Sequence, residues 1–135
     1  MVDTRDIRNI VLIGHGSSGK TSLAESMLHK TGSTNRLGSV DDKTAVCDYY
    51  DEEKEHQHSI HSALVHANHN GKLINVIDTP GYPDFMGPSI QSLAAAETAV
   101  LVISASAGIE TNTRKMFDYT KNEKMPKVIV INKID

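Results

Sequence analysis

The feature that most constrains this chain is a glycine-rich segment of eight residues close to its beginning. It reads Gly14-His15-Gly16-Ser17-Ser18-Gly19-Lys20-Thr21 and fits the pattern G-x-x-x-x-G-K-[ST]. The apolar run 10–13 before it is typical of a buried strand, and residues 21–28 after it have the apolar spacing of a helix. A strand, a glycine-rich turn and a helix in this order predict a phosphate-binding loop, here called the phosphate loop (residues 14–21).

The residue types of the phosphate loop suit the phosphates of a nucleotide. Its glycines allow a backbone path on which successive N–H groups converge on phosphate oxygens at the positive end of the following helix. Lys20 adds a charge for the β- and γ-phosphates, and the Thr21 hydroxyl is a ligand for Mg²⁺. An ordinary Gly/Ser turn is the alternative, but chance gives this pattern in on the order of one in a few hundred chains of this length. Nucleotide contacts are expected from His15, Gly16, Ser17, Ser18, Gly19, Lys20, Thr21 and Ser22.

Length and charge limit the classes of protein to consider. The 135 residues suit one domain with its own core. The chain has 14 Lys and Arg residues and 17 Asp and Glu residues, for a formal net charge of -3. The chain as a whole therefore lacks the excess of positive charge that is typical of nucleic-acid-binding proteins. The single Cys47 excludes an internal disulfide, and the first residues lack the apolar core of a signal peptide or membrane span. We expect a cytoplasmic protein without a membrane partner.

Strand-like and helix-like segments alternate along the rest of the chain. Strands are expected at 60–68, 73–77, 98–103 and 128–131, and helices at 89–97 and 108–124. Asn70-Gly71 is a strong hairpin signal, so the first two of these strands are expected to pair antiparallel. In the first of these helices, Ile90, Leu93 and Ala94 have core spacing. The order predicts an α/β fold with a doubly wound, mostly parallel sheet and helices on both faces.

An irregular segment that carries seven acidic side chains separates the first helix from the hairpin. They are Asp41, Asp42, Asp48, Asp51, Glu52, Glu53 and Glu55. A charge run by itself is typical of a solvated loop. In a protein with a phosphate loop, however, a loop of this length is more often functional.

A second motif, Asp78-Thr79-Pro80-Gly81, follows the strand 73–77 at the edge where open α/β sheets bind ligands. The Asp78 carboxylate would hold a Mg²⁺-bound water, and the N–H of Gly81 would meet a γ-phosphate. The motif therefore supplies groups that the phosphate loop lacks.

A third motif, Asn132-Lys133-Ile134-Asp135, follows the last expected strand. The Asp135 carboxylate would accept hydrogen bonds from N1–H and the exocyclic amine of guanine, and adenine offers neither donor there. Asn132 would address the other edge of the purine, and the Lys133 stem would lie over its face. The three motifs in this order predict a GTPase.

These motifs resemble the N-terminal part of the G domain of a translational GTPase, most closely elongation factor G and its paralogues. The resemblance covers essentially the whole chain and includes residues 9–15, 30–32, 78–85 and 132–135. It implies a P-loop NTPase G domain over residues 1–135, truncated before its last strand, with switch I at about 33–60 and switch II at about 78–89. It also implies GTP or GDP with Mg²⁺, hydrolysis of GTP to GDP and phosphate, and a ribosome (rRNA and ribosomal proteins) bound through the full-length protein.

The stretch 48–60 resembles the family's first switch, which normally ends R-G-I-T-I. By that correspondence Ser59 stands where a threonine ligates Mg²⁺ and senses the γ-phosphate. The implied metal ligands are Thr21, Ser59 and Asp78, and the implied catalytic residues are Lys20, Gly81 and Tyr82.

Several positions depart from the family pattern. His56 and Gln57 replace an arginine and a glycine, and Ser17 stands where the family usually has an aspartate. Tyr82 stands where a histidine commonly orients the attacking water, and a phenol with a pKa near 10 is a poor general base at neutral pH. We therefore expect slow hydrolysis and a paralogue instead of the principal translocase.

Other functions remain open from the sequence. One is a nucleotide-dependent binding switch with little or no hydrolysis, and another is a ribosome-associated GTPase of the release-factor or ribosome-protection type. An ATP-dependent phosphotransferase conflicts with Asp135.

Five histidines crowd one region and raise the question of a zinc site: His56, His58, His61, His66 and His69. His56 and His58 would share a strand face, but no cysteine or carboxylate completes a site at a recognised spacing, so we favour solvated residues. We also expect no redox role for Cys47, because the acidic residues nearby disfavour its thiolate.

Overall fold

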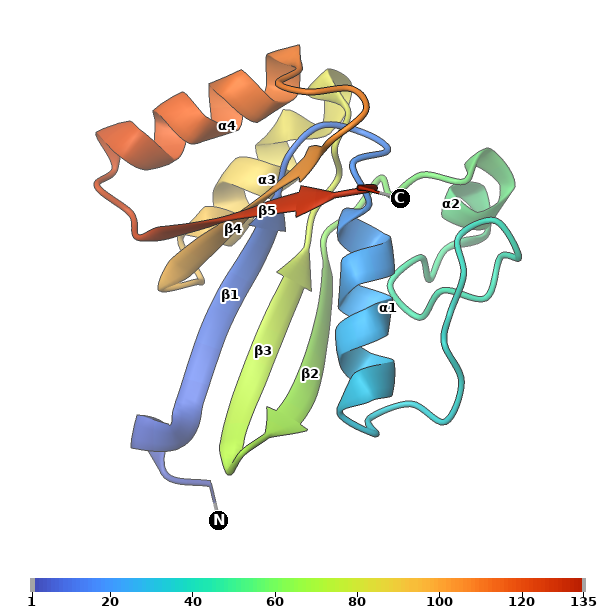
Figure 1. The fold of residues 1–135 in the computed structure, drawn as a ribbon, viewed down its shortest axis with the longest axis vertical. Coiled ribbons are helices and arrows are strands. Elements are labelled where there is room, and N and C mark those ends of the chain that lie inside the picture. Colours follow the sequence, from blue (N-terminus) through green and yellow to red (C-terminus); the bar gives the residue numbers. More distant parts are fainter. Residues whose placement is uncertain (1, 135) are drawn as a thin grey trace.

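A five-stranded sheet with the order β2-β3-β1-β4-β5 forms the centre of the computed structural model, which describes residues 2–134 (Figure 1). The strands are β1 (Ile7–Ile13), β2 (Ala63–His69), β3 (Lys72–Asp78), β4 (Thr98–Ser104) and β5 (Lys127–Asn132). β1 is parallel to β3 and β4, β4 is parallel to β5, and β2 is antiparallel to β3. The predicted mostly parallel sheet with one antiparallel hairpin strand is confirmed.

The hairpin between β2 and β3 has the two-residue loop that the sequence predicts. Asn70 and Gly71 have φ angles of 48° and 74°, and His69 pairs with Lys72 across the loop. Positive φ at both positions is what a type I′ turn requires, and Asn-Gly adopts it with little strain.

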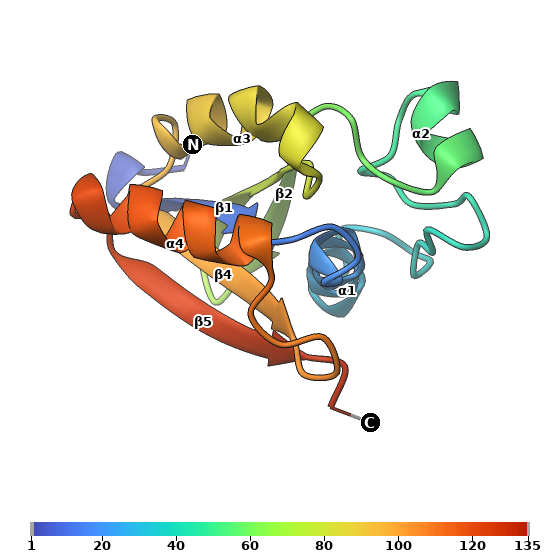
Figure 2. The ribbon, with the colours of Figure 1, turned by 90° about the horizontal axis from the view of Figure 1, so that it is seen from above.

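Helices cover both faces of the sheet, as Figure 2 shows. The helices are α1 (Lys20–Lys30), α2 (Asp51–His56), α3 (Met86–Leu93) and α4 (Thr111–Asn122), with 3₁₀ turns at Thr4–Asp6 and Pro83–Phe85. Val11 of β1 packs with Leu93 and Met116 of α3 and α4, whereas the next residue, Leu12, packs with Ala24 of α1. Alternate side chains of a strand point to opposite faces, so the central strand joins two cores. This confirms the doubly wound fold.

The helix predicted at 89–97 lies earlier in the chain, because α3 begins at Met86 and ends at Leu93. The backbone N–H of Glu97 donates to the carbonyl of Asn9 at 3.0 Å, and the Glu97 carboxylate accepts from the Asn9 N–H at 2.6 Å. These bonds tie residue 97 to β1 and prevent the helix from continuing. The expected core position Ala94 is the C-cap of α3 and is exposed.

The helix predicted at 108–124 is also shorter than expected. Gly108 donates its N–H to the carbonyl of Ser104 and so belongs to the turn that follows β4. α4 then runs from Thr111 to Asn122.

The acidic segment before the hairpin is partly buried, so the solvated-loop interpretation is wrong for two of its residues. Asp48 is 3% and Glu53 1% exposed, and Glu53 lies in α2, a helix that the sequence pattern did not predict. His56 and His58 do not share a strand face, because α2 ends at His56 and Gln57 turns the chain with a φ of 55°.

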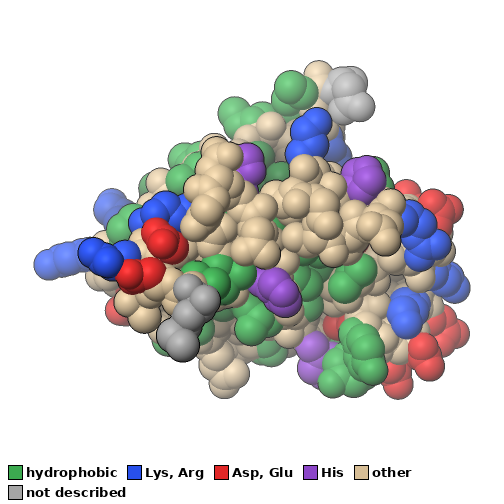
Figure 3. Space-filling model, turned by 90° about the horizontal axis from the view of Figure 1, so that it is seen from below, with side chains coloured by type: hydrophobic (Ala, Val, Ile, Leu, Met, Phe, Trp, Pro, Cys, Tyr) green, Lys and Arg blue, Asp and Glu red, His purple; other side chains and the backbone are tan. Residues whose placement is uncertain are grey.

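The surface of the molecule mixes charges of both signs. On the face shown in Figure 3, Lys and Arg side chains are scattered among acidic and uncharged ones. β5 forms one edge of the sheet, and its Val128, Ile129 and Ile131 side chains are each more than half exposed. Between residues 2 and 134, no helix is both long enough and apolar enough to cross a bilayer.

Candidate nucleotide-binding site

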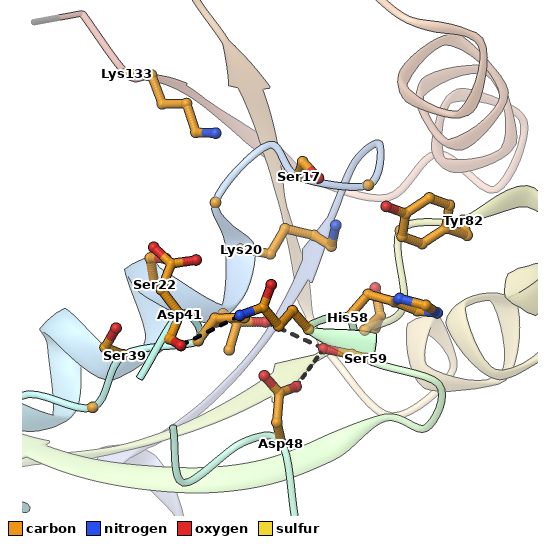
Figure 4. Close-up of a pocket in the computed structure, with 18 of the residues that line it drawn as sticks. Ser17, Lys20, Ser22, Ser39, Asp41, Asp48, His58, Ser59, Tyr82 and Lys133 are labelled. Atoms are coloured by element: carbon orange, nitrogen blue, oxygen red, sulfur yellow. Dashed lines mark hydrogen bonds between the residues drawn. The ribbon is translucent and has the colours of Figure 1, made fainter. Parts of the chain in front are cut away.

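A cavity of about 450 Å³ lies where β1 and β3 end and α1 begins. Its lining comes from four segments, together with Asp48 and Lys133: residues 16–22 without Ser18, 37–41, 57–59 and 79–82 without Pro80. Figure 4 shows Tyr82 and His58 at one end of the cavity and Lys133 at the other. The volume is in the range of small-molecule binding sites, and its position is the edge where open α/β sheets bind ligands.

The phosphate loop is fixed by contacts with the end of β5. Gly19 is the N-cap of α1 and has a φ of 93°, a conformation that favours glycine, and a Cβ there would collide with the Asn132 side chain. The Asn132 amide donates to the carbonyl of Ser18 at 3.1 Å. Asn132 therefore joins the base motif to the phosphate loop, a contact that the sequence analysis did not foresee.

Lys20 points its ammonium group along the phosphate loop. Its Nζ donates to the carbonyls of His15 at 2.8 Å and Gly14 at 3.4 Å, and only 5% of the residue is exposed. Desolvation lowers the pKa of Lys20 to about 8, although the charges of Asp78 and Glu110 act in the opposite direction. A buried ammonium whose close partners are carbonyls is a strong site for an anion.

The three predicted metal ligands meet at the start of α1. Thr21 Oγ1 donates to Asp78 Oδ2 at 2.6 Å and lies 3.3 Å from Ser59 Oγ. Asp78 Oδ1 is buried and has no hydrogen-bond partner within the described chain. Burial raises the pKa of Asp78 to about 6, with hydrogen bonding from Thr21 and the charge of Lys20 opposing it. Two hydroxyls and one carboxylate, of which one oxygen is unpaired, form a donor set that fits Mg²⁺.

Asp48 holds the Ser59 hydroxyl from the other side. Ser59 Oγ donates to Asp48 Oδ1 at 2.8 Å (Figure 4). Burial raises the pKa of Asp48, while this hydrogen bond opposes the shift. In the sequence Asp48 belongs to the charge run and to the stretch 48–60 that resembles the first switch, and its burial was the missing information.

Glu53 fixes the backbone directly after Ser59. Its Oε1 accepts from the N–H groups of Ile60 and His61, both at 2.9 Å, and its Oε2 accepts from that of Tyr50 at 3.2 Å. Burial by itself would raise the pKa of Glu53, but the three backbone donors outweigh it and the net shift is downward. Glu53 is three residues into α2, where a carboxylate reaches back to the helix start, but α2 itself was not predicted from the sequence.

Glu25 of α1 fixes the backbone of the acidic segment just before Asp48. Its Oε1 accepts from the N–H groups of Val46 at 2.6 Å and Cys47 at 3.0 Å. Cys47 is buried, and this burial, followed by the charges of Asp78 and Glu25, raises the pKa of its thiol far above its usual range. The thiolate is disfavoured as predicted, with burial as the main cause in place of nearby charge.

Gly81 and Tyr82 lie against the phosphate loop. A Cβ at Gly81 would collide with Lys20 Nζ and would lie 2.6 Å from the backbone N of Gly16. The Tyr82 ring is 36% exposed and packs on Gly16, and its centroid is 4.8 Å from that of the His58 ring. The residue expected to act on the attacking water thus lies beside the phosphate loop.

Two residues at the start of α4 were missed by the sequence analysis. Asn112 Nδ2 donates to the carbonyl of Gly81 at 2.8 Å, and Glu110 Oε1 lies 3.4 Å from Nε2 of His15. The His15 ring is therefore directed to α4 and does not line the cavity. Neither residue belongs to a motif, so the sequence carried no signal for them.

The remaining predicted residues lie as follows. Ser17, with a φ of 59°, and Ser22 line the cavity together with Lys133. The Gln57 side chain donates to the carbonyl of Asp41 at 3.3 Å and closes the cavity on that side. Asp135 lies outside the described residues.

The clustered histidines lie in and after α2 and along β2. Within residues 2–134, no group of three or more His, Cys, Asp or Glu side chains is arranged to hold a metal ion. The His56 and His58 rings lie 5.7 Å apart at the end of α2.

The cavity and its three motifs define a nucleotide-binding domain of the P-loop class, and sequence comparison identifies the family. A model of the elongation factor Tu GTP binding domain matches residues 5–135. The chain belongs to this family, and the resemblance to a translational GTPase is confirmed.

Individual relatives agree with this membership. The chain is 40% identical over 128 residues to the mitochondrial ribosome-releasing factor 2 of Candida albicans, covering 95% of this chain and 16% of that protein. It is 37% identical over 129 residues to the elongation factor G-like protein of Mycobacterium tuberculosis, covering 96% of this chain and 18% of that protein. A crystal structure from Thermus thermophilus matches with a TM-score of 0.92 at 35% identity, covering 96% of this chain and 20% of that one. The chain thus spans less than a fifth of the length of these two named relatives.

Proposed function

We propose that this chain binds GTP with Mg²⁺ and hydrolyses it slowly, as the G domain of an elongation factor G-like factor that acts on the ribosome. The observation that carries the proposal is the convergence of Thr21, Ser59 and Asp78 next to the buried ammonium of Lys20. Oxygen ligands beside a desolvated positive charge suit a metal-bound triphosphate.

The phosphates would be bound by the phosphate loop. Its backbone N–H groups lie at the start of α1, where the helix dipole favours anions, and Lys20 would exchange its carbonyl partners for phosphate oxygens. Thr21, Ser59 and Asp78 would hold Mg²⁺. When bound, the metal neutralises charge on the β- and γ-phosphate oxygens.

The two segments that respond to the γ-phosphate would be switch I, about 33–60, and switch II, about 78–89. Ser59 would contribute its hydroxyl from the first, and Gly81 its N–H from the second. Asp48 and Glu53 support this proposal, because they fix Ser59 and the backbone that follows it.

The base would lie against the end of β5. Lys133 would cover its face, and Asp135 would accept the two guanine donors. Asn132 would act mainly by holding the phosphate loop through Ser18, as its hydrogen bond indicates.

Tyr82 would set the rate of hydrolysis. The phenol lies against Gly16 and can bind a water, but it cannot remove a proton efficiently at neutral pH. The same observation favours a second candidate, a nucleotide-dependent binding switch whose hydrolysis is negligible.

The ribosome is the proposed partner, supported by the names of the two relatives. Their greater length supports the proposal that contacts with rRNA and ribosomal proteins come from the full-length protein, and that the exposed edge β5 is covered there. The cytoplasm is the proposed location. A fluorescent fusion of the full-length protein would distinguish it from the mitochondria named for the Candida albicans relative.

Single-turnover GTP hydrolysis by the full-length protein, with and without ribosomes, tests the proposal. Ribosome-stimulated release of phosphate is expected. Binding of GTP without measurable hydrolysis in either condition would favour the binding switch, and the absence of guanine-nucleotide binding would refute both.

A further inference from the structure

The start of α4 contacts the site from outside its three motifs. Asn112 is the second residue of α4 and is fully buried. Its Nδ2 donates to the carbonyl of Gly81 at 2.8 Å, while its Oδ1 has no partner within the described chain. A buried amide with one unsatisfied oxygen is costly, so its one hydrogen bond deserves an explanation.

Gly81 is confined on its other side by the phosphate loop. A Cβ at this position would collide with Lys20 Nζ and would lie 2.6 Å from N and 2.7 Å from Cα of Gly16. Gly81 therefore lies between Lys20 and the Asn112 amide. Its carbonyl is held from α4, and this bond fixes the peptide that joins Gly81 to Tyr82.

The residue that caps α4 contacts the phosphate loop itself. Glu110 is the N-cap of α4, and its Oε1 lies 3.4 Å from Nε2 of His15. One turn of backbone thus carries both a contact with the phosphate loop and a contact with switch II. The distance between these two segments depends on the start of α4.

We propose that Asn112 is a positioning residue that sets Gly81 for recognition of the γ-phosphate, and so determines how well the protein distinguishes GTP from GDP. The inference rests on the proposed function. GDP has no γ-phosphate and would not reach Gly81, so Asn112 acts on the binding of the triphosphate alone.

The substitution Asn112→Leu tests the inference, because it keeps the number and branching of the side-chain heavy atoms while removing the donor and the unpaired oxygen. In the full-length protein with Mg²⁺, the affinities for GDP and for the non-hydrolysable β,γ-imido analogue of GTP are measured by calorimetry. The ratio of triphosphate to diphosphate affinity is expected to fall by about 2- to 10-fold, the equivalent of one net hydrogen bond. The GDP affinity is expected to stay within about twofold of the wild type.

A matched control comes from the same helix. Thr120 is also fully buried, but its hydroxyl bonds only the carbonyls of Met116 and Phe117 within α4. Thr120→Val is expected to lower the melting temperature without changing the affinity ratio. If Asn112→Leu does not fold, Asn112→Asp, which places an oxygen against the Gly81 carbonyl, is measured in the same way and is expected to lower the ratio.

Two outcomes would count against the inference and are distinguishable. An unchanged ratio in both Asn112 variants, with a wild type that binds both nucleotides, overturns the positioning role alone. A wild type that binds neither nucleotide overturns the proposed function and the inference with it.

Discussion

The phenol ring of Tyr82 packs directly on Gly16, and a Cβ at Gly16 would lie 3.0 Å from two of its ring carbons. The His58 ring lies against the same phenol with a centroid distance of 4.8 Å. The ring is thus held between the phosphate loop and His58, which follows α2. Because position 16 has no side chain, there is room at position 82 for a residue larger than the histidine that the family commonly has at position 82.

The contact between these two residues predicts an energetic coupling. Gly16→Ala is expected to destabilise the wild type, because the ring must move by a few tenths of an ångström. In a Tyr82→Ala background the same change is expected to cost little, for a coupling of about 0.5–1.5 kcal/mol. Urea unfolding of the four variants measures it, and additive effects would show that the ring does not pack on Gly16 in solution.

The position of Tyr82 predicts a gain of activity. Tyr82→His supplies a group that can orient the attacking water, so hydrolysis is expected to speed up within or below the range of ~10²–10⁴-fold typical of such groups. Nucleotide affinity is expected to change little. Single-turnover hydrolysis by the full-length protein with ribosomes is the measurement. Unchanged turnover would show that Tyr82 is not the limiting substitution, and would direct attention to Ser59 and its neighbours His56 and Gln57.

Glu53 predicts a pH dependence of stability. Its pKa in the folded protein is below its ordinary value of 4.5 because three backbone N–H groups bind the carboxylate. Its stabilising contribution is therefore complete above about pH 4.5 and is lost as the pH falls through the folded pKa. Glu53→Gln is expected to lower the free energy of unfolding by about 1–3 kcal/mol at pH 7 and less at pH 3.

The control for this experiment is Glu52→Gln, which changes an exposed residue of the same helix. Its free energy of unfolding is expected to stay within about 0.5 kcal/mol of the wild type. A constant difference between wild type and Glu53→Gln from pH 7 to pH 3 would disprove the role of the charged carboxylate.

The sequence predicted those parts of the site whose residues lie directly at the ends of predicted strands and helices, because the order of these elements places them side by side. Lys20 and Thr21 follow a strand and start a helix, and Asp78 ends the neighbouring parallel strand, so topology places them at one edge. Ser59 was predicted only through the family resemblance, and the structure places it at the same point.

The residues that support this site could not be predicted, because their partners are backbone groups that only the folded chain brings within reach. Glu53 and Glu25 look like ordinary surface acids until folding brings N–H groups to them. Asn112 similarly looks like a polar residue of an exposed helix. Ala94 was assigned to the core from its spacing, but α3 ends at Leu93 and its C-cap, Ala94, is exposed.

The proposed role of Asp135 predicts which nucleotide base the protein prefers. Asp135→Asn is expected to weaken the binding of guanine nucleotides and to favour xanthine, whose O2 accepts where the guanine amine donates. Equilibrium competition between GDP and XDP on the full-length protein checks this. An unchanged base preference would show that the motif at 132–135 does not read the base.

The most direct test of the account is competition for a fluorescent GDP analogue bound to the full-length protein with Mg²⁺. GTP and GDP are expected to displace the analogue, whereas ATP at the same concentration is not. Lys20→Ala is expected to keep its circular dichroism spectrum and lose nucleotide binding, because the buried ammonium donates to carbonyls of the phosphate loop and would serve the phosphates. Displacement by ATP as readily as by GTP, or unchanged GDP affinity in Lys20→Ala, would contradict the assignment of this cavity as a guanine-nucleotide site.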